Sequence, residues 1–123
     1  MTKSLVFLAA ALFASGVAIA ADRSDAEMQL AQAENAVQSA ERDDAARYAV
    51  SDLDEARAML RTAHVAYDSR AWTDSARYAE RAKVSGVLAG ARSRQQRAEI
   101  ATTEIERSVS TLRDQLGLPG GTP

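Results

Sequence analysis

Apolar residues recur every three or four positions along nearly all of the chain after residue 20, which is the spacing of one face of an α-helix. In the first stretch these positions are Ala26, Leu30, Ala33, Val37 and Ala40. In the second stretch they are Leu53, Ala56, Leu60, Ala63 and Tyr67. The sequence shows no alternating pattern long enough to indicate a β-strand. We therefore expect an all-α fold with about three helices.

The third stretch has the most regular pattern. Its positions keep a strict seven-residue repeat, which is typical of the seam of a coiled coil. The repeat, called the heptad seam below, consists of Val84, Leu88, Ala91, Gln95, Ala98, Thr102, Ile105, Val109, Leu112 and Leu116. Alanine buries little area, so a core built mainly of alanine is thin. We therefore predict a dimer or higher assembly through the third helix, which would offset that weakness.

Capping and turn residues place the helix boundaries. Ser51 is a candidate N-cap for the second helix, which we expect to end near residues 68–70. The third helix is expected to start at about Trp72 and to be stopped by Gly117. Residues 44–50 form either a short joint or a continuation of the first helix.

Helix lengths favour a long antiparallel hairpin. At 1.5 Å per residue the third helix reaches roughly 65 Å and the second only about 27 Å. If the first two helices lie end to end with a bend near residue 48, a turn near Arg70 folds the chain into a coiled-coil-like hairpin. This register places Leu30 near Leu112, Val37 near Ile105, and Arg92, Arg94 and Arg97 near Asp43 and Asp44. The alternative is a compact bundle in which the first helix packs back on the hairpin and the end of the third protrudes.

Residues 1–20 have the pattern of a secretory signal peptide. Lys3 precedes an apolar run at 5–19, and small residues at 18–20 form the cleavage site. Cleavage after Ala20 leaves a helical domain at 21–116, a flexible tail at 117–123 and no stable membrane span. We expect an exported, periplasmic protein. The alternative is an uncleaved segment that anchors the chain in the inner membrane.

The inventory of reactive residues argues against an enzyme. The chain has no cysteine, so it forms no disulfide, and His64 is its only histidine. His64 and Asp68, one helical turn apart, supply only two ligands for a weak zinc or copper site. Gly86 and Gly90 lie inside a helical pattern and indicate close helix packing or a hinge, not a phosphate loop. We expect no catalytic residue, no cofactor and no dedicated metal site.

Charge lies in blocks along the chain, although the formal net charge is only −2. Residues 22–55 hold ten acidic and three basic side chains, and residues 56–98 hold nine basic and three acidic ones. The arginine block, defined as Arg92, Arg94 and Arg97, is a candidate contact surface because guanidinium groups bind carboxylates and phosphates. The alternative is internal pairing with the acidic residues near 43 and 44. A chain with negative net charge outside the cytoplasm is not expected to bind nucleic acid.

The aromatic residues gather near the predicted turn. Trp72 is the only tryptophan, and Tyr67 and Tyr78 flank it at about one to two helical turns. This cluster is either a small core that closes the tip of the hairpin or an exposed aromatic binding surface.

The spacing of these residues resembles a bacterial family, the domain of unknown function numbered 4398. The resemblance rests on residues 48–56, on the turn through Trp72, and on the alanine and leucine positions Leu60, Ala63, Ala76, Ala79 and Ala82. It covers roughly residues 25–116. The chain departs from the family pattern at Val50, where proline is usual. The resemblance implies a small exported helical protein without catalytic residues. Some relatives carry a peptidoglycan-binding domain of the outer-membrane-protein-A type. This chain shows no such domain, so the resemblance does not imply contact with the cell wall.

These observations favour a structural or protein-interaction module of the cell envelope that binds a protein partner or itself. The alternative is a holdase-like module that shelters apolar segments of exported proteins in an alanine-rich groove. A third hypothesis, a small enzyme that depends on His64, is the one that we least expect.

Overall fold

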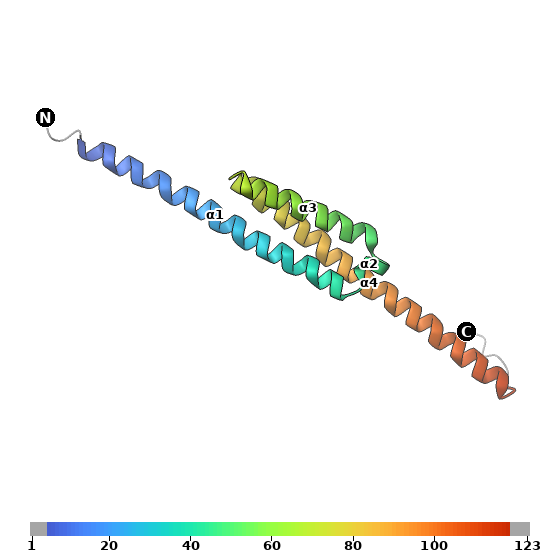
Figure 1. Cartoon of the computed structure of the whole chain (residues 1–123). Helices are drawn as coiled ribbons and strands as arrows, with labels where there is room; N and C mark the ends of the chain where they lie inside the picture. Colours follow the sequence, from blue (N-terminus) through green and yellow to red (C-terminus); the bar gives the residue numbers. More distant parts are fainter. Residues whose placement is uncertain (1–4, 119–123) are drawn as a thin grey trace.

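The computed structural model describes the backbone of residues 5–118 and the side chains of residues 22–118, so the predicted signal segment at 1–20 lies outside the described side chains. Four helices follow one another along the chain (Figure 1). They are α1 (Leu5–Arg42), α2 (Ala45–Tyr48), α3 (Val50–Asp68) and α4 (Trp72–Gln115). The predicted all-α class is confirmed, and the described residues contain no strand.

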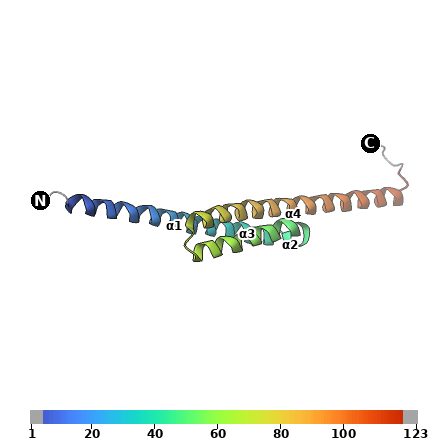
Figure 2. The same ribbon diagram turned by 90° about the horizontal axis from the view of Figure 1, so that it is seen from above.

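Helices α1 and α3 both pack along the first half of α4, as the two ribbon views show (Figures 1 and 2). Helix α1 runs parallel to α4, because Gln32 accepts a hydrogen bond from Lys83 at 3.0 Å while Asp43, further along α1, pairs with Arg94. Helix α3 runs antiparallel to both. The bundle therefore has up-down-up topology.

The hairpin with its first two helices end to end is wrong, and the compact bundle with a protruding third helix is correct. Leu30 belongs to a core cluster with Ala79 and Ala82, not with Leu112. Val37 belongs to a second cluster that contains Ala89, so it does not lie near Ile105. The physical reason is that the chain reverses direction between α1 and α3, which places α3 beside α1 and not beyond it.

The reversal is the short joint expected at residues 44–50. Asp44 has a left-handed backbone with φ of 63°, and it stops α1 at Arg42. The next four residues form the single turn of α2. Helix α3 then begins at Val50, with Ala49 at the N-cap position and no side-chain cap. The prediction of Ser51 as the cap is wrong because the helix begins one residue before it.

Small side chains form most of the core. Among the described residues, ten of the thirteen buried hydrophobic side chains are alanine. Helices that meet through alanine and glycine approach closely: a Cβ on Gly86 would lie 3.1 Å from the backbone carbon of Ala36. Gly86 and Gly90 are both buried. Of the two interpretations of these glycines, close helix packing is therefore confirmed, and the hinge is not.

The second half of α4 extends beyond the bundle. Buried positions on this helix stop at Ser93, and every residue from Arg94 to Leu118 is exposed. At 1.5 Å per residue, the part of α4 after Ser93 is about 33 Å long. Figure 1 shows it as a rod that continues past α2. The molecule is thus a bundle with one projecting helix.

The turn between α3 and α4 is closed by an arginine in a glycine-type conformation. Arg70 has φ of 62°, its N–H donates to the Tyr67 carbonyl at 2.9 Å, and the Ala71 N–H donates to the Ala66 carbonyl at 2.9 Å. This is the Schellman motif that commonly ends helices, with the position normally taken by glycine occupied by a residue with a Cβ.

Replacing Arg70 by glycine should therefore stabilise the fold. We expect Arg70→Gly to raise the free energy of unfolding by about 0.5–1 kcal/mol, because glycine adopts this conformation without the steric cost. Urea denaturation followed by circular dichroism measures the change. Arg61→Gly, at an exposed position inside α3, is the control and should lower stability by about 1 kcal/mol. A destabilising Arg70→Gly would contradict the described turn.

Candidate interaction surface

The heptad seam lies on the outer face of α4. The positions of α4 that contact α1 and α3 form a separate set, consisting of Ser75, Ala79, Ala82, Gly86, Ala89, Gly90 and Ser93. Every residue of the heptad seam is exposed. Because successive residues on a helix are turned by about 100°, the two sets point in roughly opposite directions from the helix axis. The predicted seam is therefore not used by the bundle.

The seam grows more apolar toward the end of α4. Alanine and polar residues occupy its middle from Ala91 to Thr102. Its last four positions are Ile105, Val109, Leu112 and Leu116, with Ile105 at 64% and Leu116 at 71% exposure. A contiguous apolar stripe on an exposed protein surface is typical of an interaction site.

Helix α4 ends in a second Schellman motif, which is followed by one more exposed leucine. Gly117 has φ of 64°, and the Leu118 N–H donates to the Arg113 carbonyl at 3.0 Å. The prediction that Gly117 stops the helix is confirmed. Leu118 is 54% exposed and was not noticed in the sequence, because it lies outside the seven-residue repeat. Residues 119–123 of the predicted tail lie outside the described residues.

The arginine block holds α4 to the joint between α1 and α3. Arg94 pairs with Asp43, and Arg97 lies 3.4 Å from a carboxylate oxygen of Asp44, as the charge pattern predicted. Arg92 instead donates to both oxygens of Asp52, at 2.6 and 2.8 Å. This bond raises the pKa of Arg92. The structure therefore places all three arginines in the internal pairing that the sequence allowed as an alternative.

The aromatic residues pack at the opposite end of the bundle. The rings of Tyr67 and Trp72 meet edge to face, with their centres 4.8 Å apart. The Arg23 guanidinium of α1 lies 5.8 Å from the centre of the Trp72 ring. Tyr78 packs against the cluster around Leu30. This arrangement matches a small core that closes the turn, so these three residues make no open aromatic surface.

Tyr67 also changes the pKa of a carboxyl group on α1, that of Glu27. The Tyr67 hydroxyl donates to Glu27, and Arg23 donates to the same carboxylate at 3.0 Å. Both hydrogen bonds lower the pKa of Glu27 from its ordinary value of 4.5, and the bond from Tyr67 has the larger effect. A carboxyl whose pKa is lowered on folding stabilises the fold above that ordinary value, and the contribution is lost as pH falls through the lowered pKa.

Removing the tyrosine hydroxyl should therefore shift this titration. In Tyr67→Phe we expect the pKa of Glu27 to rise toward 4.5, because the larger of the two stabilising hydrogen bonds is gone. An NMR titration of the Glu27 side chain in both proteins measures the shift. Tyr78→Phe is the matched control and should leave Glu27 unchanged. Equal Glu27 pKa values in the parent protein and Tyr67→Phe would contradict the contact between α1 and α3.

The single histidine pairs across the bundle. His64 Nε2 lies 3.1 Å from a carboxylate oxygen of Glu34 on α1. Both side chains are about half exposed. In the part of the chain with described side chains, no three histidine, aspartate or glutamate residues gather closely enough to hold a metal ion.

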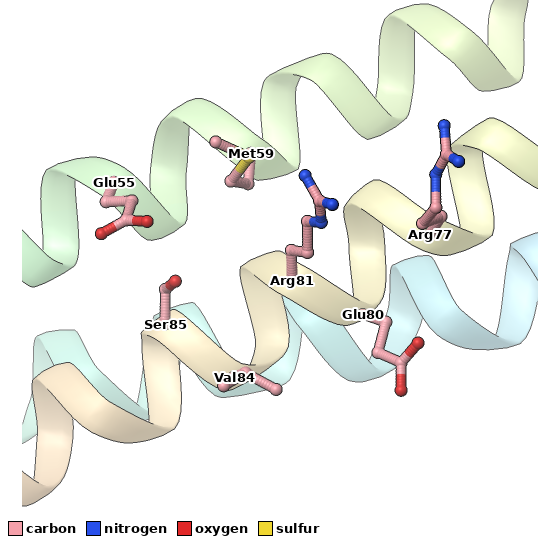
Figure 3. Close-up of a pocket in the computed structure, with 7 residues that line it drawn as sticks. All are labelled: Glu55, Met59, Arg77, Glu80, Arg81, Val84 and Ser85. Carbon is pink, nitrogen blue, oxygen red and sulfur yellow. The ribbon is translucent and has the colours of Figure 1, made fainter.

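An open groove lies between α3 and α4, beside the first residue of the heptad seam. Its volume is about 470 Å³. Its lining residues are Glu55, Met59, Arg77, Glu80, Arg81, Val84 and Ser85. Figure 3 shows Met59 on α3 and Arg81 on α4 extending into the space between the two helices. Sequence reasoning missed this groove because two separate helices form it.

The fold and surface define an all-α domain, a three-helix bundle with one projecting helix. A family model described as "Domain of unknown function (DUF4398)" matches residues 28–105, and the chain belongs to this family. The matched segment includes most of the bundle core and ends at Ile105, so the last three positions of the seam lie outside it. No curated protein and no solved structure matches the chain. Among the residues with described side chains, no helix is both long and apolar enough to cross a membrane.

Proposed function

We propose that this protein is a non-enzymatic interaction module that associates through the heptad seam of α4. The single observation that supports the proposal is the exposure of this seam on a helix that the bundle holds by its opposite face. The three-helix bundle holds the first half of α4 in place. The projecting half of α4 exposes the apolar end of the heptad seam to solvent.

The seam is suited to another helix. It covers residues 84–116, or nearly five heptads, and a helix of that length measures about 50 Å. Apolar residues at seven-residue spacing insert between four residues of a facing helix, which is the knobs-into-holes packing of coiled coils. A helical partner can therefore cover the whole stripe, whereas a small molecule covers only a fraction of it.

The proposal includes export and the absence of catalysis. The signal pattern at 1–20 supports secretion to the periplasm with cleavage after Ala20. Mass spectrometry of the mature chain from the periplasmic fraction tests this, and an N-terminus other than Ala21 would count against it. The scarcity of reactive side chains supports a non-enzymatic role, because the chain contains no cysteine and His64 is its only histidine.

The holdase alternative receives less support. It relied on an alanine-rich groove, and the alanines of α4 that face α1 and α3 are buried in the bundle. Apolar clients would have to bind the heptad seam instead. Promiscuous binding there is an outcome that the experiment below distinguishes.

Photo-cross-linking in living cells tests the proposal directly. A photoreactive amino acid at position 109 lies on the seam, and one at position 107 lies on the opposite face of the same helical turn. We expect one or a few discrete adducts from position 109. The same adducts should be absent when the photoreactive residue is at position 107. Identical adducts from both positions, or none from 109, would overturn the proposal. A smear of many exported proteins from 109 would replace it with the holdase function.

A further inference from the structure

We propose that the heptad seam is covered by a second copy of the same chain running in the antiparallel direction, with residue 84 of one copy opposite residue 116 of the other. This inference rests on the proposed function and adds the partner and its orientation. The resulting dimer has twofold symmetry, with the two bundles at opposite ends of a shared pair of α4 helices.

Side-chain size favours the antiparallel direction. In the proposed register, the facing layers are Val84 with Leu116, Leu88 with Leu112, Ala91 with Val109, Gln95 with Ile105, and Ala98 with Thr102. Each alanine then faces a β-branched residue, which fills the space that alanine leaves. In a parallel dimer each layer would repeat one residue, so Ala91 and Ala98 would face alanine while Leu112 and Leu116 faced leucine. Such uneven layers leave voids, which cost stability in a packed interface.

The groove beside Val84 is consistent with the proposed register. Because Val84 faces Leu116 in the proposed register, the end of α4 from the second copy reaches this groove. Its two exposed leucines, Leu116 and Leu118, are held at the helix end by the Gly117 turn. Met59 on α3 and Val84 on α4 are the apolar residues that line the groove. A parallel dimer would leave the groove empty and place these leucines against their own copies.

The bundle does not obstruct this arrangement. Helices α1 and α3 cover the face of α4 opposite the seam, so a second α4 can lie along the seam from end to end. Arg92, which donates to Asp52 of its own chain, also comes near Glu106 of the other copy on both sides of the dimer. The two copies of Glu99 meet at the centre as a like-charge pair, which opposes association, and each accepts a hydrogen bond from Gln95 of its own helix at 2.9 Å.

Disulfide exchange distinguishes the directions, because the chain contains no cysteine of its own. We would mix Ala91→Cys protein with Val109→Cys protein, one of them carrying a mass tag, and allow oxidation. A disulfide requires Cα atoms within about 7 Å. The proposal predicts cross-links between the two variants in at least tenfold excess over cross-links within either one. Arg107→Cys, on the opposite face, is the control and should form none with either partner.

Each outcome decides the question. Cross-links of Ala91→Cys with itself and of Val109→Cys with itself would overturn the antiparallel direction while leaving self-association intact. Monomers without cross-links, from proteins with unchanged circular dichroism, would overturn the second copy as the occupant; the photo-cross-linking at position 109 then decides the proposed function separately. The pair Ala98→Cys and Thr102→Cys repeats the test at the centre of the seam and must agree with the first pair.

Discussion

Leu53→Ala should lower the free energy of unfolding by about 2–5 kcal/mol, which is the usual cost of removing a fully buried leucine. Leu53 is the largest fully buried side chain described in the bundle. It contacts a cluster made mostly of alanine, including Ala45, Ala56 and Ala89. Alanine side chains cannot rotate into the cavity that the substitution leaves, so the expected cost lies in the upper part of that range. Domains of this size are stable by only about 5–15 kcal/mol in total.

Urea denaturation followed by circular dichroism measures this effect. Val65→Ala, on the same helix but 66% exposed, is the matched control and should change stability by no more than about 0.5 kcal/mol. If the two substitutions cost the same, Leu53 does not sit at the junction of α1, α3 and α4, and the bundle described here is wrong.

Gly86→Ala should destabilise the protein by about 1–3 kcal/mol, the usual cost of overpacking. Inside a helix the same change normally stabilises by about 1 kcal/mol, so its sign depends on the neighbouring helix. The new Cβ would lie 3.1 Å from two backbone atoms of α1, the carbon of Ala36 and the nitrogen of Val37. Backbone atoms of a packed helix cannot move aside without shifting the whole of α1.

Gly90→Ala is the matched control, one turn further along the same face. Its new Cβ would approach a carboxylate oxygen of Asp43 at 3.0 Å, and this side chain can rotate away. We expect a change within about 0.5 kcal/mol of zero, because the gain in helix propensity offsets the adjustment. Thermal unfolding of both variants provides the comparison. A Gly86→Ala protein more stable than the parent would show that α1 does not lie against α4 in this register.

The sequence predicted the helices well because apolar spacing and turn residues act locally. The turn near Arg70, the start of α4 at Trp72 and its end at Gly117 all agree with the structure. The direction of α1 was not predictable in the same way. Asp44 reverses the chain through a left-handed conformation, which aspartate adopts more often than most residues but still uncommonly, and no glycine marks the place.

Charge did not resolve this direction either. The joint at residues 43 and 44 lies near residues 92–97 of α4 in both arrangements, so the ion pairs of Arg94 and Arg97 agree with either one. Only the residues far from the joint distinguish them. Leu30 is such a residue, and an alanine-rich helix accepts a leucine almost anywhere along its length.

The candidate surface was predictable in its residues but not in its exposure. The heptad seam is evident from its apolar spacing, and the sequence both placed Ile105 and Leu112 in the core of the hairpin and predicted assembly through the third helix. The bundle instead uses a second repeat on α4, made of small residues from Ser75 to Ser93. Small residues contribute little hydrophobic signal, although they allow the closest approach between helices. The more apolar face of α4 is therefore left exposed.

Sedimentation velocity of the purified protein across the micromolar range tests the central claim, that the heptad seam is a surface of self-association. We predict that the parent protein sediments as a dimer at the upper end of this range. Ile105→Glu should sediment as a monomer with unchanged helix content, because burying an unpaired carboxylate in the seam is costly. Arg107→Glu, on the opposite face, should remain a dimer. A parent protein that stays monomeric throughout, or an Ile105→Glu protein that still dimerises, would contradict the claim.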